Sequence, residues 1–191
     1  MSQTDPRPLR ADARRNRERI VEAARDVFAR CGPEAQMDDI ARAACVGVGT
    51  VYRHFPTKSA LVGELMATKF RHTAEVARRW AQEPDGWTAF EGFLRECFAA
   101  MARDATLQQR VLWSSDAEAL ERAEGARQEL VEVVGGIIER AREQRRLRSS
   151  FSVEDMPALM TAVGAVMAAQ DRDVTRADGF IELVLDGLRC G

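Results

Sequence analysis

The sequence has few of the residues that build metal centres and disulfide bonds. Its 191 residues include two histidines and four cysteines, and no two of the cysteines form a CxxC pair. Zinc sites use closely spaced Cys and His ligands, so we expect no metal site and no cofactor. Without paired cysteines the thiols are expected to be reduced, with Cys31 filling a small space in the core.

Long apolar segments are also missing. No apolar run approaches the roughly 18 residues that suggest a membrane-spanning helix. The N-terminus lacks the apolar centre of a signal peptide. We therefore expect a cytoplasmic protein with no membrane partner.

Signatures of catalysis are absent as well. The sequence contains no GxSxG, no HExxH, no glycine-rich phosphate-binding loop and no carboxylate pair with a credible cleft. An enzyme is therefore not expected. Strands are not expected either, because no stretch alternates apolar and polar residues.

Residues 48 to 55 sort by chemistry when they are placed on a helix at about 100° per residue. Val48, Val51 and Phe55 fall on one arc, which is the expected core face. Gly49 and Arg53 fall on the opposite arc, flanked by Thr50, Tyr52 and His54. A slim centre with hydroxyl and cationic groups beside it suits a helix that enters a DNA groove. A short amphipathic surface helix is the alternative.

The flanking sequence favours the DNA-binding interpretation. Residues 14 to 31 have helical apolar spacing, with the core face Ile20, Ala24, Val27, Phe28 and Cys31. Gly32 and Pro33 stop this helix, and a second helix is expected from Met37 to Ala44. Cys45 to Gly47 form the turn into the third helix, which ends before Pro56. This order predicts a three-helix helix-turn-helix module.

The module closely resembles the TetR family of bacterial transcriptional regulators. The matching residues run from Met37 to Ala41, on to Val46, and from Gly49 to Leu61, with a weaker match at 183–189. The resemblance implies a core of Ile40, Val51 and Phe55. It also implies phosphate contacts from Thr50, Tyr52, His54 and Lys58, and an approach to bases by Val48, Gly49 and Arg53.

The chain departs from the family pattern at two positions. Gln36 stands where many relatives have Thr or Ser, whose hydroxyl caps the second helix and contacts a phosphate. Gln36 remains in the expected DNA-binding set, although it is a poorer cap. Cys45 stands where relatives usually have Gly, so a positive φ there would strain the backbone.

The charge is unevenly distributed along the chain. Residues 1–72 carry 13 Lys or Arg and 9 Asp or Glu, whereas the whole chain has a net charge of −2. A basic head on an acidic body fits DNA binding. Six arginines lie between residues 7 and 19. Residues 1–12 are expected to form a flexible basic arm, which is either simply solvated or follows the DNA backbone.

The remainder is expected to be helical, at about 57–82, 87–103, 106–114, 116–147, 152–171 and 176–189. Thr57 and Ser152 are expected helix caps, and Gly135-Gly136 an expected bend. The predicted fold is all-α, with about nine helices in total. A helix-turn-helix domain at 13–57 precedes a helical bundle at 58–191, for which the resemblance implies ligand binding and dimerisation.

The resemblance implies a small-molecule pocket in this bundle. Apolar pockets between helices are lined by aromatic and methionine side chains. The candidates are Met66, Phe70, Phe90, Phe93, Leu94, Met101, Trp113, Val133, Ile137 and Met160. Arg95 and Glu96 are among the nearest polar groups that could orient a mainly apolar ligand. Ordinary core packing is the alternative for each residue.

The last two helices carry many small and aliphatic residues, which permit close helix approach. The resemblance implies that they pair with a second copy, whereas closing the monomer's own bundle is the alternative. The leading hypothesis is a homodimeric repressor that a small, mainly apolar ligand releases from a palindromic double-stranded DNA operator. A thiol-responsive regulator acting through Cys45, or a ligand-binding bundle with no transcriptional role, are the other hypotheses.

Overall fold

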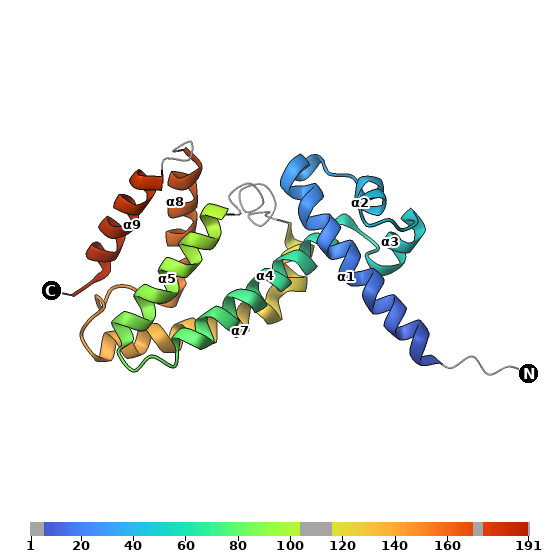
Figure 1. Ribbon diagram of the computed structural model, residues 1–191. Helices are drawn as coiled ribbons and strands as arrows, with labels where there is room; N and C mark the ends of the chain where they lie inside the picture. The colour runs from blue at the N-terminus through green and yellow to red at the C-terminus, as the bar shows by residue number, and fades with distance from the viewer. Residues whose placement is uncertain (1–5, 104–115, 170–173, 191) are drawn as a thin grey trace, which may run out of the picture. The chain divides into compact units, whose positions relative to one another are not determined.

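The computed structural model describes residues 6–103, 116–169 and 174–190, and these are all-α, as predicted (Figure 1). The described ranges contain eight α-helices, two 3-10 turns and one isolated β-bridge. The helix predicted at 106–114, including the candidate Trp113, lies outside them. No helix in the described ranges is long and apolar enough to cross a membrane.

The chain divides into two compact units. The N-terminal unit comprises Met1–Met66 and Arg110–Ala123, and the C-terminal unit comprises Ala67–Gln109 and Glu124–Gly191. Two helices, α4 (Lys58–Trp80) and α7 (Ala117–Glu143), have residues in both units.

The N-terminal unit is built on α1 (Pro6–Cys31), α2 (Met37–Ala43) and α3 (Val48–His54). The helical spacing in α1 buries Ile20, Ala24, Val27 and Phe28, each at most 1% exposed. Gly32, with φ 60°, then turns the chain out of the helix. Because Cys31 is the last residue of α1, where the chain leaves the core, it is exposed and the expectation that it fills the core was wrong.

Helix α1 begins at Pro6, so the segment 6–12 of the expected basic arm is helical. Helix α4 begins where the sequence predicted. The Ala60 N–H donates to Thr57 Oγ1 at 2.9 Å, which confirms Thr57 as its cap.

The first turns of α4 and α7 contact each other within the N-terminal unit. Asp116 caps α7 by accepting a bond from the Ala119 N–H at 3.1 Å, and it also accepts one from the Ser59 hydroxyl. A Cβ on Gly63 would lie 2.9 Å from the Ala119 carbonyl oxygen. The beginning of α7 is therefore part of the same compact unit as α1 to α3.

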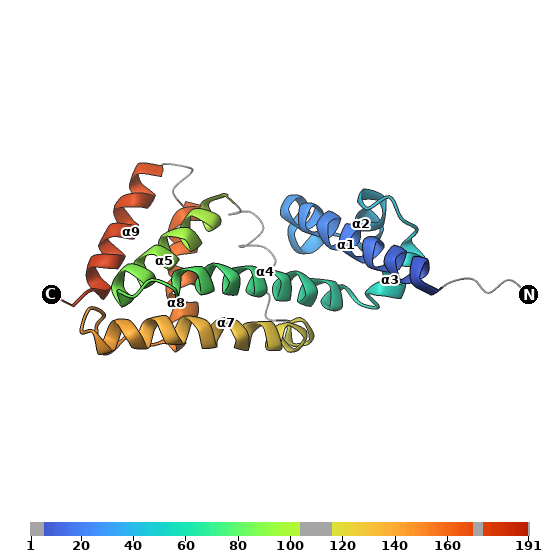
Figure 2. The same ribbon diagram turned by 60° about the horizontal axis from the view of Figure 1, so that its bottom comes forward.

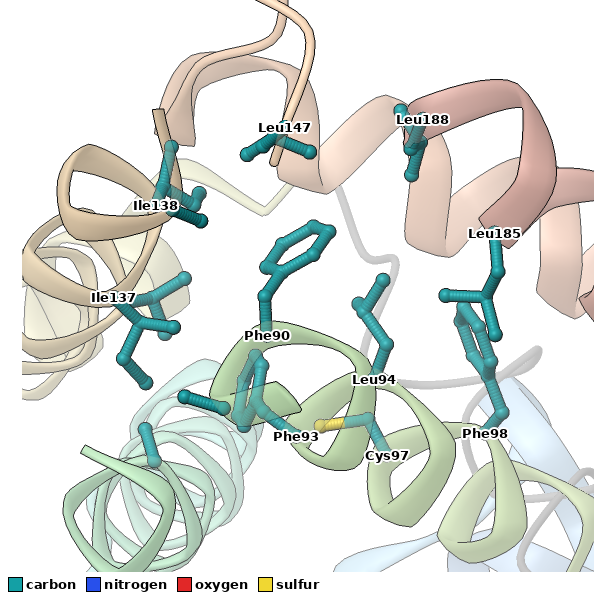
Figure 3. Packing of buried hydrophobic residues seen from close by; sticks show 14 of the residues in the cluster. Phe90, Phe93, Leu94, Cys97, Phe98, Ile137, Ile138, Leu147, Leu185 and Leu188 are labelled. Atoms are coloured by element: carbon teal, nitrogen blue, oxygen red, sulfur yellow. The ribbon is translucent and has the colours of Figure 1, made fainter. Parts of the chain in front are cut away.

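The C-terminal unit packs around α5 (Gly86–Arg103), with α8 (Met156–Ala169) and α9 (Val174–Leu188) beside it (Figures 1 and 2). Phe90, Phe93 and Phe98 of α5 are at most 2% exposed. They lie between Ile137 of α7 and Leu185 of α9 (Figure 3). Four large side chains and one cysteine on one helix face thus lie at the centre of the core: Phe90, Phe93, Leu94, Phe98 and Cys97.

The ends of the remaining helices follow local capping rules. Helix α7 ends earlier than predicted, because Arg145 adopts φ 54° and reverses the chain. Ser152 precedes a 3-10 turn, Val153–Asp155, and its N–H donates to the Asp155 carboxylate at 2.8 Å. After α9, the Cys190 N–H donates to the Arg146 carbonyl at 2.8 Å, which ties the end of the chain to the loop after α7.

The start of α5 lies very close to α7. The Gly86 N–H donates to Gln144 Oε1 at 2.6 Å, and a Cβ on Gly86 would lie 2.5 Å from the Ala141 backbone nitrogen. Because the obstacle is backbone, a side-chain rotation cannot relieve the contact.

Replacing this glycine should therefore cost stability. We expect Gly86→Ala to lower the free energy of unfolding by about 1–3 kcal/mol, the usual cost of overpacking. The matched control is Gly125→Ala in α7, where an added Cβ meets no atom within 4 Å. It should raise the free energy of unfolding by about 0.5–1 kcal/mol, since alanine favours helix. Urea unfolding measures both variants. Equal effects of the two substitutions on the free energy of unfolding would contradict a steric clash at Gly86.

Candidate nucleic-acid interface

Helix α3 has one buried side and one solvent-exposed side. Val51 is 0% and Phe55 is 3% exposed, and they pack in the core that α1 and α2 also form. Gly49, Tyr52 and Arg53 are exposed, and a Cβ added to Gly49 would meet no atom within 4 Å. The outer side of α3 therefore has a shallow centre between longer side chains.

Val48 differs from the sequence-based expectation. The helical wheel puts Val48 on the core face with Val51 and Phe55, but its side chain is 42% exposed. Because Val48 is the first residue of α3, it lies one turn before the residues that pack into the core. It therefore belongs with exposed Gly49, Tyr52 and Arg53 on the outer side of α3. Together with half-buried Thr50 and His54, and with half-buried Lys58 at the start of α4, we call these residues the outer face.

The packing beneath α3 fixes its orientation in the N-terminal unit. The Arg17 guanidinium lies 5.2 Å from the centre of the Phe55 ring and forms an ion pair with Glu64 at 2.6 Å. The Lys58 ammonium lies 5.7 Å from the centre of the Phe28 ring, at the start of α4. Phe55 is thus held from α1, and α3 cannot rotate without breaking these contacts.

The turn between α2 and α3 is a Schellman motif. The Val46 N–H donates to the Ala41 carbonyl at 3.0 Å, and the Cys45 N–H donates to the Arg42 carbonyl at 3.2 Å. Cys45 has φ 53°, the left-handed conformation that glycine adopts readily. Cys45 therefore has the backbone strain that the sequence predicted for a non-glycine residue at this position.

The Gln36 side chain does not cap α2. It occupies the N-cap position of α2, but its side chain makes no capping hydrogen bond. Its amide instead donates to the Glu34 carbonyl at 2.9 Å. The expectation that Gln36 caps poorly is confirmed, and the exposed side chain lies at the start of α2.

Several arginines of α1 have partners within the N-terminal unit. Arg14 pairs with Glu18 at 3.6 Å, and Arg15 pairs with Asp12. Arg19 donates from Nη2 to the Ala44 carbonyl at 2.6 Å. The side chains of Arg7 and Arg10 lie outside the described part of the chain.

The structure brings most of the ligand-binding candidates together in the C-terminal unit. Five of them belong to its buried core, namely Phe90, Phe93, Leu94, Met101 and Ile137. Two more, Val133 and Met160, are partly buried and pack against that core. Met66 is buried in the N-terminal unit, and Phe70 is half-buried on α4.

The polar candidates beside this core are held in ion pairs. Arg95 bonds to Glu91 at 2.8 Å and to Glu182 at 2.7 Å. The hydrogen bond from Arg95 lowers the pKa of Glu182. Glu96 accepts a bond from the Trp80 indole at 2.9 Å. Burial raises the pKa of the Cys97 thiol to about 12, so this cysteine stays protonated. Among the described residues, no group of three or more His, Cys, Asp or Glu could hold a metal ion.

Comparisons with known protein families match both parts of the chain. Residues 20–65 match the model of bacterial regulatory proteins of the tetR family. Residues 85–190 match the model described as transcriptional regulator SbtR-like, C-terminal domain. The HTH-type transcriptional regulator TtgW of Pseudomonas putida is 39% identical over 71 residues. That match covers 37% of this chain and 52% of TtgW, so the chain spans about half the length of this relative.

Solved structures match over nearly the whole chain. A TetR transcription regulatory protein from Mycobacterium vanbaalenii is 33% identical, with a TM-score of 0.63, and the match covers 95% of this chain and 99% of that one. FadR from Bacillus subtilis, solved with stearoyl-CoA, is 20% identical with a TM-score of 0.71, covering 90% of this chain and 98% of FadR. At that identity the likeness to FadR is one of fold.

The strained turn at Cys45 gives a direct test. We expect Cys45→Gly to raise the free energy of unfolding by about 0.5–1 kcal/mol, because relief of the left-handed strain exceeds the entropy cost of glycine. Cys45→Ala is the control, since it removes the thiol but keeps the Cβ, and it should be close to neutral. Thermal unfolding measures both. A stabilising alanine would show that the thiol, and not the backbone conformation, carries the cost.

Proposed function

Because the chain belongs to the TetR family of bacterial transcriptional regulators, we propose that it is a homodimeric repressor, released from a palindromic operator by a small, mainly apolar ligand. The observation that carries the DNA-binding part is the outer face of α3. Its centre at Gly49 is open, while Val51 and Phe55 hold its other side in the core.

The outer face has the chemistry for reading a major groove. Gly49 lets the helix backbone approach base edges, and the exposed Arg53 can donate two hydrogen bonds to one guanine. Val48, now on this face, can contact a thymine methyl group. Phosphate contacts are assigned to Thr50, Tyr52, His54 and Lys58, with Gln36 as a further candidate.

The homodimer is proposed to form through α8 and α9. On α8 the exposed residues Ala158, Ala162 and Ala165 recur at helical spacing, and on α9 Leu183 is 68% exposed. Small residues along one side of a helix allow another helix to approach closely. A dimer also meets the requirement of a helix-turn-helix protein for two half-sites about one helical turn apart.

The ligand is proposed to bind within the C-terminal unit. The candidate side chains there are aromatic, aliphatic or methionine, and the nearest polar groups, Arg95 and Glu96, already have charged partners. Such a lining favours an apolar molecule. The ligand releases DNA only if it binds the DNA-incompetent conformation more tightly than the competent one.

The proposal is tested by selecting genomic DNA fragments with the purified full-length protein and footprinting them at physiological salt. A protected inverted repeat is expected, and genes beside it would indicate the chemical class of the ligand. Weak, salt-sensitive binding without sequence preference would overturn the proposal.

Two substitutions on the outer face should have different consequences for DNA recognition. Arg53→Ala should cost about 1–3 kcal/mol on the preferred sequence and relax the base preference. Lys58→Ala should weaken binding to all sequences alike and reduce the salt slope by about 1. Lys69→Ala, farther along α4, is the control for Lys58 and should leave the slope unchanged. Titrations of specific and scrambled duplexes at several salt concentrations give these values. A uniform loss for Arg53→Ala would contradict its role in reading bases.

Charges placed on the proposed dimer surface should separate the subunits. We expect Ala162→Glu and Leu183→Glu to produce monomers, because each buries an unpaired carboxylate in the interface. Ala117→Glu, at an exposed position on α7, is the control and should remain dimeric. Light scattering coupled to size exclusion gives the mass. Dimers in all three variants would exclude this surface.

A further inference from the structure

We propose that Arg19 is a positioning residue for DNA reading. It holds the end of α2 so that the strained turn at Cys45 keeps α3 in its binding orientation. The inference rests on the proposed function, because it assigns to a residue of α1 the task of presenting the recognition helix.

The geometry of Arg19 is specific to this turn. Its Nη2 donates to the Ala44 carbonyl at 2.6 Å and lies 3.4 Å from the Cys45 carbonyl oxygen. Ala44 is the C-cap of α2, and Cys45 is the next residue. One guanidinium group thus reaches from the middle of α1 to two successive carbonyls at the reversal of the chain.

The electrostatics at this place favour a cation. The last carbonyl groups of a helix have no partners within the helix and carry partial negative charge. A hydrogen bond from a charged donor is stronger than one between neutral groups. Arg19 therefore stabilises the conformation in which the Ala44 and Cys45 carbonyls both lie near its guanidinium group.

The turn needs such a contact because Cys45 is not glycine. With φ 53°, Cys45 tends to return to negative φ, where a residue with a Cβ is more stable. That change would break the bond from the Val46 N–H to the Ala41 carbonyl. Since α3 begins at Val48, only Gly47 separates Val46 from the recognition helix. Loss of the motif would therefore shift the first residues of the outer face.

The inference predicts a coupling between two residues that a phosphate contact would not produce. Arg19→Gln should lower affinity for the specific duplex about tenfold, with the non-specific affinity and the salt slope unchanged. Cys45→Gly alone should change affinity less than about twofold, because glycine keeps the left-handed turn without help. The double variant should recover most of the lost affinity.

Two further variants separate this role from the loss of a positive charge. Arg25→Gln removes an exposed arginine of the same helix, which pairs with Asp26 at 3.9 Å, and this variant should bind DNA like wild type. Arg19→Lys keeps a cationic donor and should retain more affinity than Arg19→Gln. Equal losses for Arg19→Gln with and without Cys45→Gly, together with a lower salt slope, would overturn the inference and indicate a phosphate contact. Unchanged affinity of Arg19→Gln would also overturn it.

Hydrogen exchange gives a test that does not depend on DNA. The Val46 and Cys45 amides should exchange faster in Arg19→Gln than in wild type, and the double variant should restore slow exchange. Unchanged exchange of both amides in Arg19→Gln would overturn the inference. If wild type selects no DNA sequence, the proposed function fails, while the exchange data still decide whether Arg19 holds the turn.

Discussion

The burial of Val51 and Phe55 is the contact on which the N-terminal unit depends. Val51 lies in a seven-residue helix and Phe55 directly follows it as the C-cap; the helix is too short to be stable alone, so tertiary packing must hold α3. The same packing leaves Gly49 and Arg53 on the outside, where the proposed contacts with DNA require them. Arg17 against the Phe55 ring and Glu64 adds a polar contact at the edge of this core. Core formation and exposure of the outer face are thus two results of one helical periodicity.

The turn before α3 shows how one unfavourable residue can be accommodated. A left-handed Cys45 costs conformational energy, and the Schellman bonds together with the Arg19 guanidinium oppose its relaxation. A glycine at this position would make the turn stable by itself. In this chain, Arg19 of α1 and the backbone bonds at the end of α2 stabilise the turn instead. The orientation of α3 therefore depends on contacts between helices.

Periodicity and breakers in the sequence predicted much of this structure. The α1 core face, the Thr57 cap and the all-α fold followed from spacing and local chemistry. The exposure of residues at helix ends did not follow from spacing, because a helical wheel contains no information on where the neighbouring helices stop. Cys31 and Val48 are the examples, since both are exposed. The partner of Arg19 could not be predicted either, since it is a backbone carbonyl 25 residues away. The ligand-binding candidates stay predictions, because core and pocket linings share a composition.

Packing between segments far apart in the sequence also joins α4 and α7 within each unit. Asp116 and Ala119, at the start of α7, contact Ser59 and Gly63 of α4. Farther along, Arg78 of α4 pairs with Glu129 of α7 within the C-terminal unit. Two continuous helices therefore have residues in each unit and contact each other in each. Helix α4 begins at Lys58, shortly after Phe55, so its first turn packs in the unit that holds α3.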